Sequence, residues 1–242
     1  MTILRNSFWQ RRLVAFLLHR ESTFAMKCTV LLCLCAFILV DGVKGVGKIV
    51  PLSKEVKDKI LDMHNYRRSE IATGNTKGTD FKTPYPTAAA MFEMKWDDKL
   101  AEDATAHAAT CSMEASTLSE RPSNQGENHN KFDFGAPSIT SIRPPIQQWW
   151  VPSRNVQGLP RNLVYRSSIG EQLGFFTQMA WAKTYKIGCG VARCPTKNFF
   201  VCRYYPSGNI EGEVVYPTGR TGSGCTNGRS NRYQGLCRTP PL

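Results

Sequence analysis

Few side chains of this sequence are suited to metal binding or to proton transfer near neutral pH. Imidazole does both, and the chain has four histidines, His19, His64, His107 and His129. His129 follows Glu127 by two residues and is the sole candidate for a weak rebuilt metal site, but a histidine in a surface loop is the favoured interpretation. We expect His64 to be a half-buried, hydrogen-bonded ring. We expect His107, between alanines on a helix, to be packed or to face solvent.

Cysteine is the second source of chemistry. Of nine cysteines, Cys28, Cys33 and Cys35 fall in an N-terminal segment that we expect to be removed. No Cys-x-x-Cys pair with a matching His or Cys pair is present, so disulfides are favoured over a metal site. If every remaining cysteine is bonded, the chain has no free thiol for a Cys-His catalytic pair. No Ser-His-Asp catalytic set can be argued from the sequence either. The remaining cysteines form an even set, which in a secreted chain predicts disulfides but allows many pairings: Cys111, Cys189, Cys194, Cys202, Cys225 and Cys237.

The segment MKCTVLLCLCAFILVDGVKG at residues 26–45 is typical of a secretory signal peptide. It has a basic residue, an apolar run too short to span a bilayer comfortably, and then small and polar residues. We expect cleavage between Asp41 and Val46, and hence a secreted, extracellular protein without a membrane span in its mature form. Residues 1–25 are interpreted as an upstream extension absent from the mature protein. The alternative is a signal anchor with the amino terminus in the cytosol, which LVAFLL at 13–18 favours slightly.

The chain is basic, and its positive charge is concentrated near the carboxyl end. The formal net charge is +12, and residues 46–242 carry +8 of it, because the first 45 residues hold six Lys or Arg against two Asp or Glu. Such an excess can attract acidic glycans, anionic lipid or nucleic acid. No motif of basic and aromatic residues accompanies it, so we expect no nucleic-acid partner. Residues 217–242 lack acidic side chains, and we expect weak binding of acidic glycans through Arg220, Arg229, Arg232 and Arg238.

Two early segments have the periodicity of amphipathic helices. Ser53 is the candidate N-cap of the first helix and Gly74 its stop, and the inward positions are Val56, Ile60, Met63, Arg67 and Ile71. Asp97 is the candidate cap of the second helix, in residues 96–111. One face of it carries Leu100, Ala104, Ala108 and Cys111, and the alanines on that face predict close packing against another element.

Loops and a third helix follow these two segments in the prediction. Residues 75–90 and 112–140 are interpreted as irregular, and PIQQWW at 145–150 as a short apolar turn ended by Pro152. The segment GEQLGFFTQMAWAKT predicts a helix from about Phe175, despite Gly174.

Short β-branched or aromatic runs near the carboxyl end predict strands. These are KIGCGVARC at 186–194, NFFVCRYYP at 198–206 and EGEVVY at 211–216. Helices first and strands late indicate an α+β domain in which helices cover a sheet.

Several motifs occur in one order between residues 53 and 216. They are HNYRR (64–68), MKWDDKLAEDATAHAATC (94–111), GEN (126–128), GFFTQMAW (174–181) and FFVCRYYPSGNI (199–210). With this ordered set the chain resembles the CAP superfamily (cysteine-rich secretory proteins, antigen 5 and pathogenesis-related proteins). The spacer PTAAAMFEMKW, the doubled Trp149-Trp150 and GLC near the end are most similar to venom-allergen-like proteins of parasitic nematodes.

The resemblance implies a three-layer α–β–α sandwich with a small antiparallel sheet, stabilised by disulfides. This CAP domain is expected at residues 46–216, followed by a basic, disulfide-pinned C-terminal extension at 217–242. Each bridge should stabilise the fold by about 2–4 kcal/mol. Relatives with this cysteine pattern imply two of the pairs and leave the third for the extension: Cys189–Cys202, Cys111–Cys194 and Cys225–Cys237.

Many members of this family present two histidines and two acidic residues in a central cleft that can hold zinc. Carried over one at a time, these positions are Ala115, Glu127, Pro152 and Phe175. Only Glu127 retains a ligand atom, so the resemblance implies a cleft without metal, cofactor or catalytic residue. We expect Phe175 to fill the space of the lost histidine with buried carbon. We expect Glu127 to be structural, with hydrogen bonds from backbone groups or from Gln178.

These features favour a secreted, non-enzymatic binding protein, an effector directed at an extracellular or host partner, either a protein or a lipid. An extracellular sterol or fatty-acid carrier is the alternative, with the apolar cleft and TPYPTAAAMF (83–92) lining a pocket. A metal-dependent hydrolase is disfavoured, because three of the four ligand positions carry no ligand atom.

If residues 26–45 are a cleaved signal, the protein that eukaryotic cells secrete should begin near Val43–Val46 and lack residues 1–25. N-terminal sequencing of the secreted material measures this start directly. A start before Met26 would contradict the interpretation.

Overall fold

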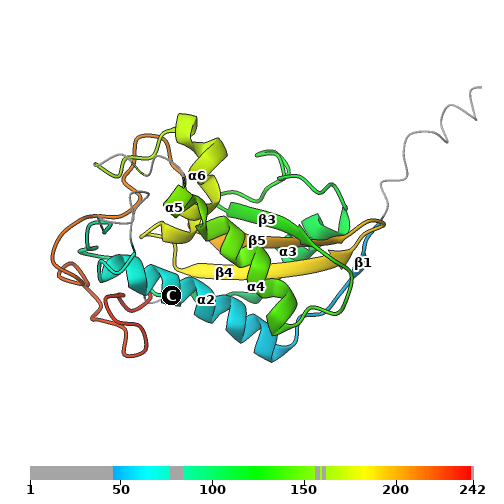
Figure 1. Ribbon diagram of the computed structural model, residues 1–242, viewed down its shortest axis with the longest axis horizontal. Coiled ribbons are helices and arrows are strands. Elements are labelled where there is room, and N and C mark those ends of the chain that lie inside the picture. The colour runs from blue at the N-terminus through cyan, green and yellow to red at the C-terminus, as the bar shows by residue number, and fades with distance from the viewer. Residues whose placement is uncertain (1–45, 77–83, 156–158, 160–161, 241–242) are drawn as a thin grey trace, which may run out of the picture. The chain divides into compact units, whose positions relative to one another are not determined.

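The computed structural model describes residues 46–76, 84–155, 159 and 162–240 (Figure 1). The predicted upstream extension (1–25) and signal segment (26–45) lie outside these residues. None of the helices within the described ranges has both the length and the apolar content that a bilayer crossing requires.

The first helix of the described ranges, α2 (Lys54–Ala72), begins where the Ser53 hydroxyl accepts a hydrogen bond from a backbone N–H of the first turn. The prediction for Arg67 is wrong, because this side chain is half-buried and places its guanidinium 5.4 Å from the ring centroid of Trp150. The neighbouring Arg68 is buried instead. The other predicted core positions are buried as expected: Val56, Ile60, Met63 and Ile71.

Arg68 ties α2 to the C-terminal end of α6 (Ser167–Ala180). Each of its six hydrogen bonds, at 2.7–3.3 Å, runs to a backbone carbonyl, and two of them share one acceptor. The last carbonyls of a helix have no hydrogen-bond partner within the helix, and they form the negative end of its dipole. A cation at this end therefore donates the missing hydrogen bonds and also interacts favourably with the dipole. Burial lowers the pKa of Arg68 to about 9, which leaves it charged at neutral pH. The acceptors belong to Phe92, Met179, Trp181, Ala182 and Thr184.

Close packing of the second helix, α3 (Asp98–Ala109), depends on glycines in the strand beneath it. The Asp97 carboxylate caps this helix, as predicted, by accepting a hydrogen bond from the Leu100 N–H at 3.0 Å. A Cβ on Gly188 or Gly190 would collide with the backbone of α3. The helix therefore approaches the sheet through positions without side chains, and its own residues Leu100, Ala104 and Ala108 are buried there.

The sheet has the order β1-β4-β5-β3, and neighbouring strands in this path are antiparallel. A further short strand, β2 (Lys95–Trp96), pairs with β4 in parallel. The two central strands match the predicted runs at 186–194 and 198–206. The strands of the path are β1 (Lys48–Ile49), β4 (Lys186–Arg193), β5 (Asn198–Tyr205) and β3 (Gly126–Phe132).

The strand prediction is wrong in two places. Residues 211–216 form no strand, and Val214 makes only an isolated bridge with Val164. Residues 126–132, interpreted as part of an irregular segment, form the edge strand β3. The sequence of β3, GENHNKF, is polar because this strand carries the cleft groups, so neither of its faces shows the apolar alternation that predicts a strand.

The middle helices begin earlier than predicted. PIQQWW is not a turn: it is the second half of α4 (Ile139–Trp150), which Ser138 caps and which contains Pro144 and Pro145. A short helix, α5 (Pro152–Asn155), follows. The third predicted helix begins at Ser167 rather than near Phe175. Gly170 lies within it, and a Cβ there would collide with the Tyr165 hydroxyl, so this glycine serves packing and does not mark a helix end.

The elements form the three layers that the resemblance implied. In Figure 1, α2 and α4 cross in front of the sheet and α3 lies behind it. Alternate residues of the central strands supply the two cores. Ile187, Val191 and Phe200 pack toward the larger core with α2, α4 and α6, whereas Phe199 and Val201 pack with the alanines of α3. The fold is therefore an α+β sandwich, as predicted.

Three disulfides join the pairs that the resemblance implied. Their Cα–Cα separations of 5.6, 4.0 and 5.0 Å belong to Cys111–Cys194, Cys189–Cys202 and Cys225–Cys237, respectively. The third bridge lies in the basic tail, which also packs on α2. Ser69 donates a hydrogen bond to the Gln234 carbonyl at 2.6 Å, and Leu236 is buried in the larger core.

Substitution of Arg68 by Met should lower the free energy of unfolding by at least about 3 kcal/mol, because several buried carbonyls lose their donors together. The matched control is Arg67→Met, one residue away, which removes a half-buried contact with Trp150 and should cost less than about 1 kcal/mol. Urea unfolding with intact disulfides measures both. Equal losses in the two variants would show that the six hydrogen bonds contribute little.

Candidate functional site

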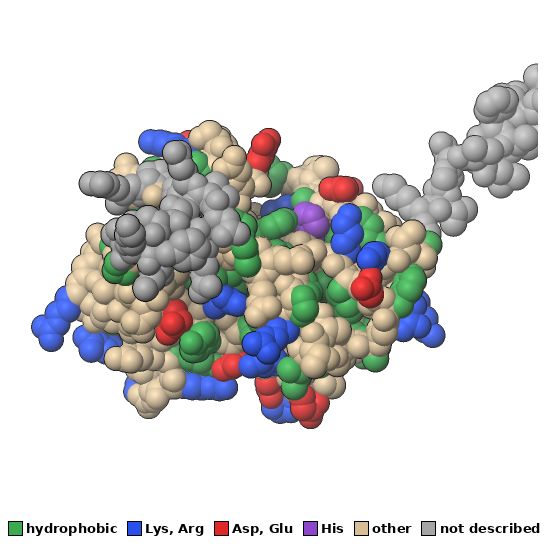
Figure 2. All heavy atoms as spheres, in the orientation of Figure 1, with side chains coloured by type: hydrophobic (Ala, Val, Ile, Leu, Met, Phe, Trp, Pro, Cys, Tyr) green, Lys and Arg blue, Asp and Glu red, His purple; other side chains and the backbone are tan. Residues whose placement is uncertain are grey.

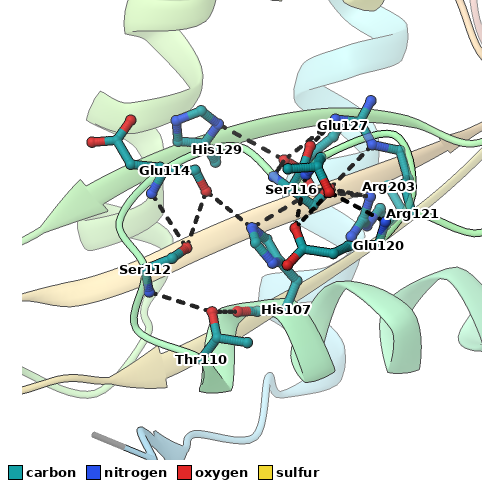
Figure 3. A network of polar contacts seen from close by, with 11 residues as sticks. His107, Thr110, Ser112, Glu114, Ser116, Glu120, Arg121, Glu127, His129 and Arg203 are labelled. Atoms are coloured by element: carbon teal, nitrogen blue, oxygen red, sulfur yellow. Dashed lines mark hydrogen bonds and ion pairs between the residues drawn. The ribbon is translucent and has the colours of Figure 1, made fainter. Parts of the chain in front are cut away.

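Glu127, the retained acid of the cleft, lies on the edge strand β3 directly opposite Arg203 of β5. The strand alternation places both side chains on the face that α3 covers. Their side chains are 1% and 2% exposed, so the two charges meet in a site almost without solvent. Figure 3 shows how the surrounding groups point toward this carboxylate.

Three short contacts occupy the Glu127 carboxylate. The Ser116 backbone N–H donates to Oε1 at 2.9 Å, and the Ser116 hydroxyl donates to Oε2 at 2.8 Å. Arg203 Nη1 lies 2.9 Å from Oε2 and also donates to the Ser116 hydroxyl oxygen at 3.0 Å. A buried carboxylate with a paired guanidinium and two further donors is satisfied where it stands.

A second guanidinium adds to the positive charge at this point. Arg121 Nη2 is 3.8 Å from Glu127 Oε1, and the same side chain donates to the hydroxyl and carbonyl oxygens of Ser116. Burial lowers the pKa of Arg203, and the Glu127 carboxylate opposes that shift. A divalent cation bound to Glu127 would lie beside two guanidiniums, so repulsion would oppose it.

Two histidines flank the same carboxylate at longer distances. His107 Nε2 is 3.9 Å and His129 Nδ1 is 4.0 Å from the nearer Glu127 oxygen. His107 Nε2 lies 3.0 Å from the Glu114 carbonyl, to which it donates, and its ring meets Phe199 edge-on at 5.6 Å. His107 is therefore packed, one of its two predicted placements, and it is a neighbour of Glu127 that the sequence did not indicate.

His129 is not in a surface loop. It lies within β3 with its side chain 18% exposed, and its ring meets Phe175 edge-on at 5.3 Å. Burial lowers its pKa, an effect that Glu127 opposes, and Nδ1 has no hydrogen-bond partner among the described residues. Together His107, Glu127 and His129 are not arranged as ligands, and the described ranges contain no cluster of three or more His, Cys, Asp or Glu side chains that could hold a metal ion.

The three lost positions supply no side-chain ligand atom. Ala115 is exposed next to Ser116, and Pro152 begins α5. Phe175 lies on α6, and the expectation of buried carbon there is wrong, because the residue is 37% exposed. Its ring covers the edge of the cleft, between His129 and Trp149, and does not fill a cavity.

Gln178 makes its hydrogen bonds away from Glu127. Its Oε1 accepts from the Gly208 N–H at 3.0 Å, and its Nε2 donates to the Thr184 hydroxyl at 3.3 Å. Glu127 and Gln178 nevertheless line one pocket of about 320 Å³. We expected backbone groups or Gln178 to donate hydrogen bonds to Glu127. The Ser116 backbone N–H does so, whereas Gln178 makes none of the short contacts.

His64 is a structural residue, and it is completely buried where the sequence predicted a half-buried ring. Nδ1 is 2.7 Å from the Ile60 carbonyl, which can only accept, so Nδ1 carries the proton and Nε2 accepts from the Tyr204 hydroxyl at 2.9 Å. Burial lowers the pKa of His64 to about 4. The ring therefore stays neutral at neutral pH and links α2 to β5.

Sequence reasoning missed Arg203 and Ser116. One signal for Arg203 was present, because an arginine within the apolar strand run FFVCRYY must find a buried acceptor. Ser116 had no such signal, since it belongs to an irregular segment whose path only the fold determines.

The sequence matches the family model described as CAP, cysteine-rich secretory protein family, over residues 61–204. Scoloptoxin SSD552 from Scolopendra dehaani is 35% identical over 195 residues, which cover 78% of this chain and 87% of the toxin. Ancylostoma secreted protein from Ancylostoma caninum is 33% identical and is matched over 78% of this chain and 45% of its own length.

A solved structure is similar over nearly its whole length. The crystal structure of NaASP2 with Zn²⁺ has a TM-score of 0.69 and 29% identity to this chain. The match covers 78% of this chain and 99% of that one. The similarity therefore extends to the complete sandwich and is not confined to a few motifs.

A double-mutant cycle should show that Glu127 and Arg203 stabilise the fold only as a pair. We expect Glu127→Gln and Arg203→Met each to lower the free energy of unfolding by about 3–5 kcal/mol, because each leaves a buried charge alone. The double variant should lose much less than the sum. Urea unfolding gives all four values.

The exposed pair Lys54–Asp58, with N and O 2.6 Å apart, is the control for the cycle, and its removal should change stability little. Additive losses at Glu127 and Arg203 would contradict the assignment of a coupled pair.

Proposed function

The chain belongs to the CAP family of cysteine-rich secretory proteins, and we propose that it is a secreted binding protein without enzymatic activity. One observation carries the proposal: the acid retained in the cleft is paired with a buried guanidinium 2.9 Å away. A carboxylate held in this way can serve neither as a metal ligand nor as a base without first losing Arg203.

The donor set of the cleft does not fit a metal ion. Ala115, Pro152 and Phe175 supply no side-chain lone pair, and the Glu127 oxygens already accept three short contacts. The NaASP2 crystal structure is one with zinc, but that ion belongs to a different chain. Hydrolysis would need an activated water or a nucleophile, and this group of side chains supplies neither.

Secretion is supported by two features of the chain and by its relatives. The segment at 26–45 has the composition of a signal peptide. The six cysteines beyond it form three disulfides, which persist in oxidising compartments. The names of the relatives describe a toxin and a secreted protein.

The mouth of the cleft offers a surface for an extracellular partner, which makes the chain a candidate host-directed effector. The pocket that contains Glu127 and Gln178 is also lined by Leu118 and Ile210, which are 87% and 39% exposed. With the half-exposed Phe175 nearby, these apolar groups around polar backbone resemble the centre of a protein-binding patch. We assign the proposed contact to this rim.

The alternative as a sterol or fatty-acid carrier has less support. Its expected pocket lining, residues 83–92, lies in the described chain from residue 84 onward. Three of its apolar side chains, Tyr85, Ala88 and Met91, are buried in the core, so they are committed to packing. Mass analysis of organic extracts from the purified protein distinguishes the carrier, which would contain stoichiometric lipid.

The wild-type protein should bind no zinc at physiological concentration, and Phe175→His should not restore binding, because Arg203 still occupies Glu127 and Ala115 and Pro152 still supply nothing. The stability cost of this substitution should be small, since Phe175 is 37% exposed. Isothermal titration and elemental analysis measure the uptake. Stoichiometric, submicromolar zinc in the wild type, lost in His129→Gln, would overturn the proposal.

A further inference from the structure

A second pocket lies between α2 and α4, and it shares no lining residue with the cleft pocket. Its volume is about 360 Å³. Figure 2 faces the crossing of these helices, and the lower middle of the view shows a group of blue Lys and Arg side chains with red Asp and Glu side chains beside and below it. The polar groups that line this groove are Lys59, Asp62, Tyr66, Arg67, Arg143 and Gln147.

The groove has an excess of positive charge. Three of its lining side chains are cations and one, Asp62, is an anion. Asp62 is shared: Lys59 lies 3.3 Å and Arg232 of the tail 3.6 Å from its oxygens, and the Tyr233 hydroxyl donates to it at 2.9 Å. With Arg232 at the edge, the groove holds four cations against one carboxylate, and that carboxylate already has three contacts.

The groove also has the means to orient a ligand. The Arg67 guanidinium lies over the Trp150 ring, with Cζ 5.4 Å from the ring centroid, and this contact keeps its charge at the wall of the groove. That positive charge attracts an oxyanion in the groove. Tyr66 is 57% exposed and presents an aromatic ring, and the amide of Gln147 can both donate and accept.

We propose that this groove binds a sulfated saccharide of an extracellular polysaccharide. Sulfate groups match the cations, the C–H faces of a sugar ring can pack on Tyr66, and sugar hydroxyls can pair with Gln147. The inference goes beyond the binding role proposed for the cleft and does not depend on the metal content of that site.

We assign saccharide binding to the groove and not to the basic tail. Arg229 and Arg238 use their Nε groups to bind backbone carbonyls within the tail, at 3.3 and 3.1 Å. Arg232 instead reaches Asp62 and lies over the Tyr233 ring at 5.1 Å, which places a tail cation at the groove.

The test compares two variants with the same change of net charge, in the full secreted chain. Lys59→Gln/Arg143→Gln removes two cations from the groove. Lys48→Gln/Arg193→Gln removes two exposed cations that face each other across β1 and β4. Isothermal titration with a heparin-derived hexasaccharide should show a loss of affinity of about tenfold or more in the first variant and less than about twofold in the second. Wild-type affinity should fall as salt rises.

Four outcomes would overturn the proposal. Equal losses in the two variants would show attraction by net charge alone. Equal affinity of the wild type for the desulfated hexasaccharide would exclude sulfate recognition. A larger loss in Arg220→Gln/Arg238→Gln than in the groove variant would return the site to the tail. Vesicles containing phosphatidylserine are the last comparison, and tighter binding to them than to the hexasaccharide would identify a lipid surface as the partner and contradict the assignment.

Discussion

A single guanidinium fixes the relation between α2 and α6. Arg68 of α2 donates to carbonyls at the end of α6, in the turn after it and at Phe92. These groups could not otherwise be buried, because a helix cannot satisfy its own last carbonyls. The position of α6 follows from this contact, and with it the positions of Phe175 and Gln178 at the cleft. A core side chain with no part in the site thus determines its geometry.

The two faces of the sheet are packed in different ways. On one side, aromatic and branched side chains of β4 and β5 fill the space beneath α2, α4 and α6. On the other side, Gly188 and Gly190 let the backbone of α3 lie directly on β4, so there is little apolar volume to fill. That thin side is where Arg203 reaches Glu127. A buried ion pair survives there because Ser116 satisfies the remaining oxygen positions and neighbouring Arg121 adds positive charge.

The cleft therefore keeps the framework of a polar site but not its chemistry. A metal ion would require ligand atoms whose lone pairs are free. The cleft instead presents the Glu127 carboxylate paired with Arg203, and an aromatic edge formed by Phe175 and His129. In the function we propose, binding therefore comes from surfaces. Two candidates are the apolar rim around Leu118 and the basic groove between α2 and α4, and they call for partners of different chemistry.

Residue types and their order determined much of this protein. The periodicity of 51–74, the capping residues Ser53 and Asp97 and the even cysteine count are local or compositional, so helices, caps and disulfides could be predicted. The ordered motifs supplied the fold class, and Phe175 showed a missing ligand. Only the tertiary structure decided that Arg68 rather than Arg67 is buried, that GENHNKF is a strand, and that Arg203 neutralises Glu127. Each depends on partners distant in sequence, across strand register and helix contacts, which no local pattern encodes.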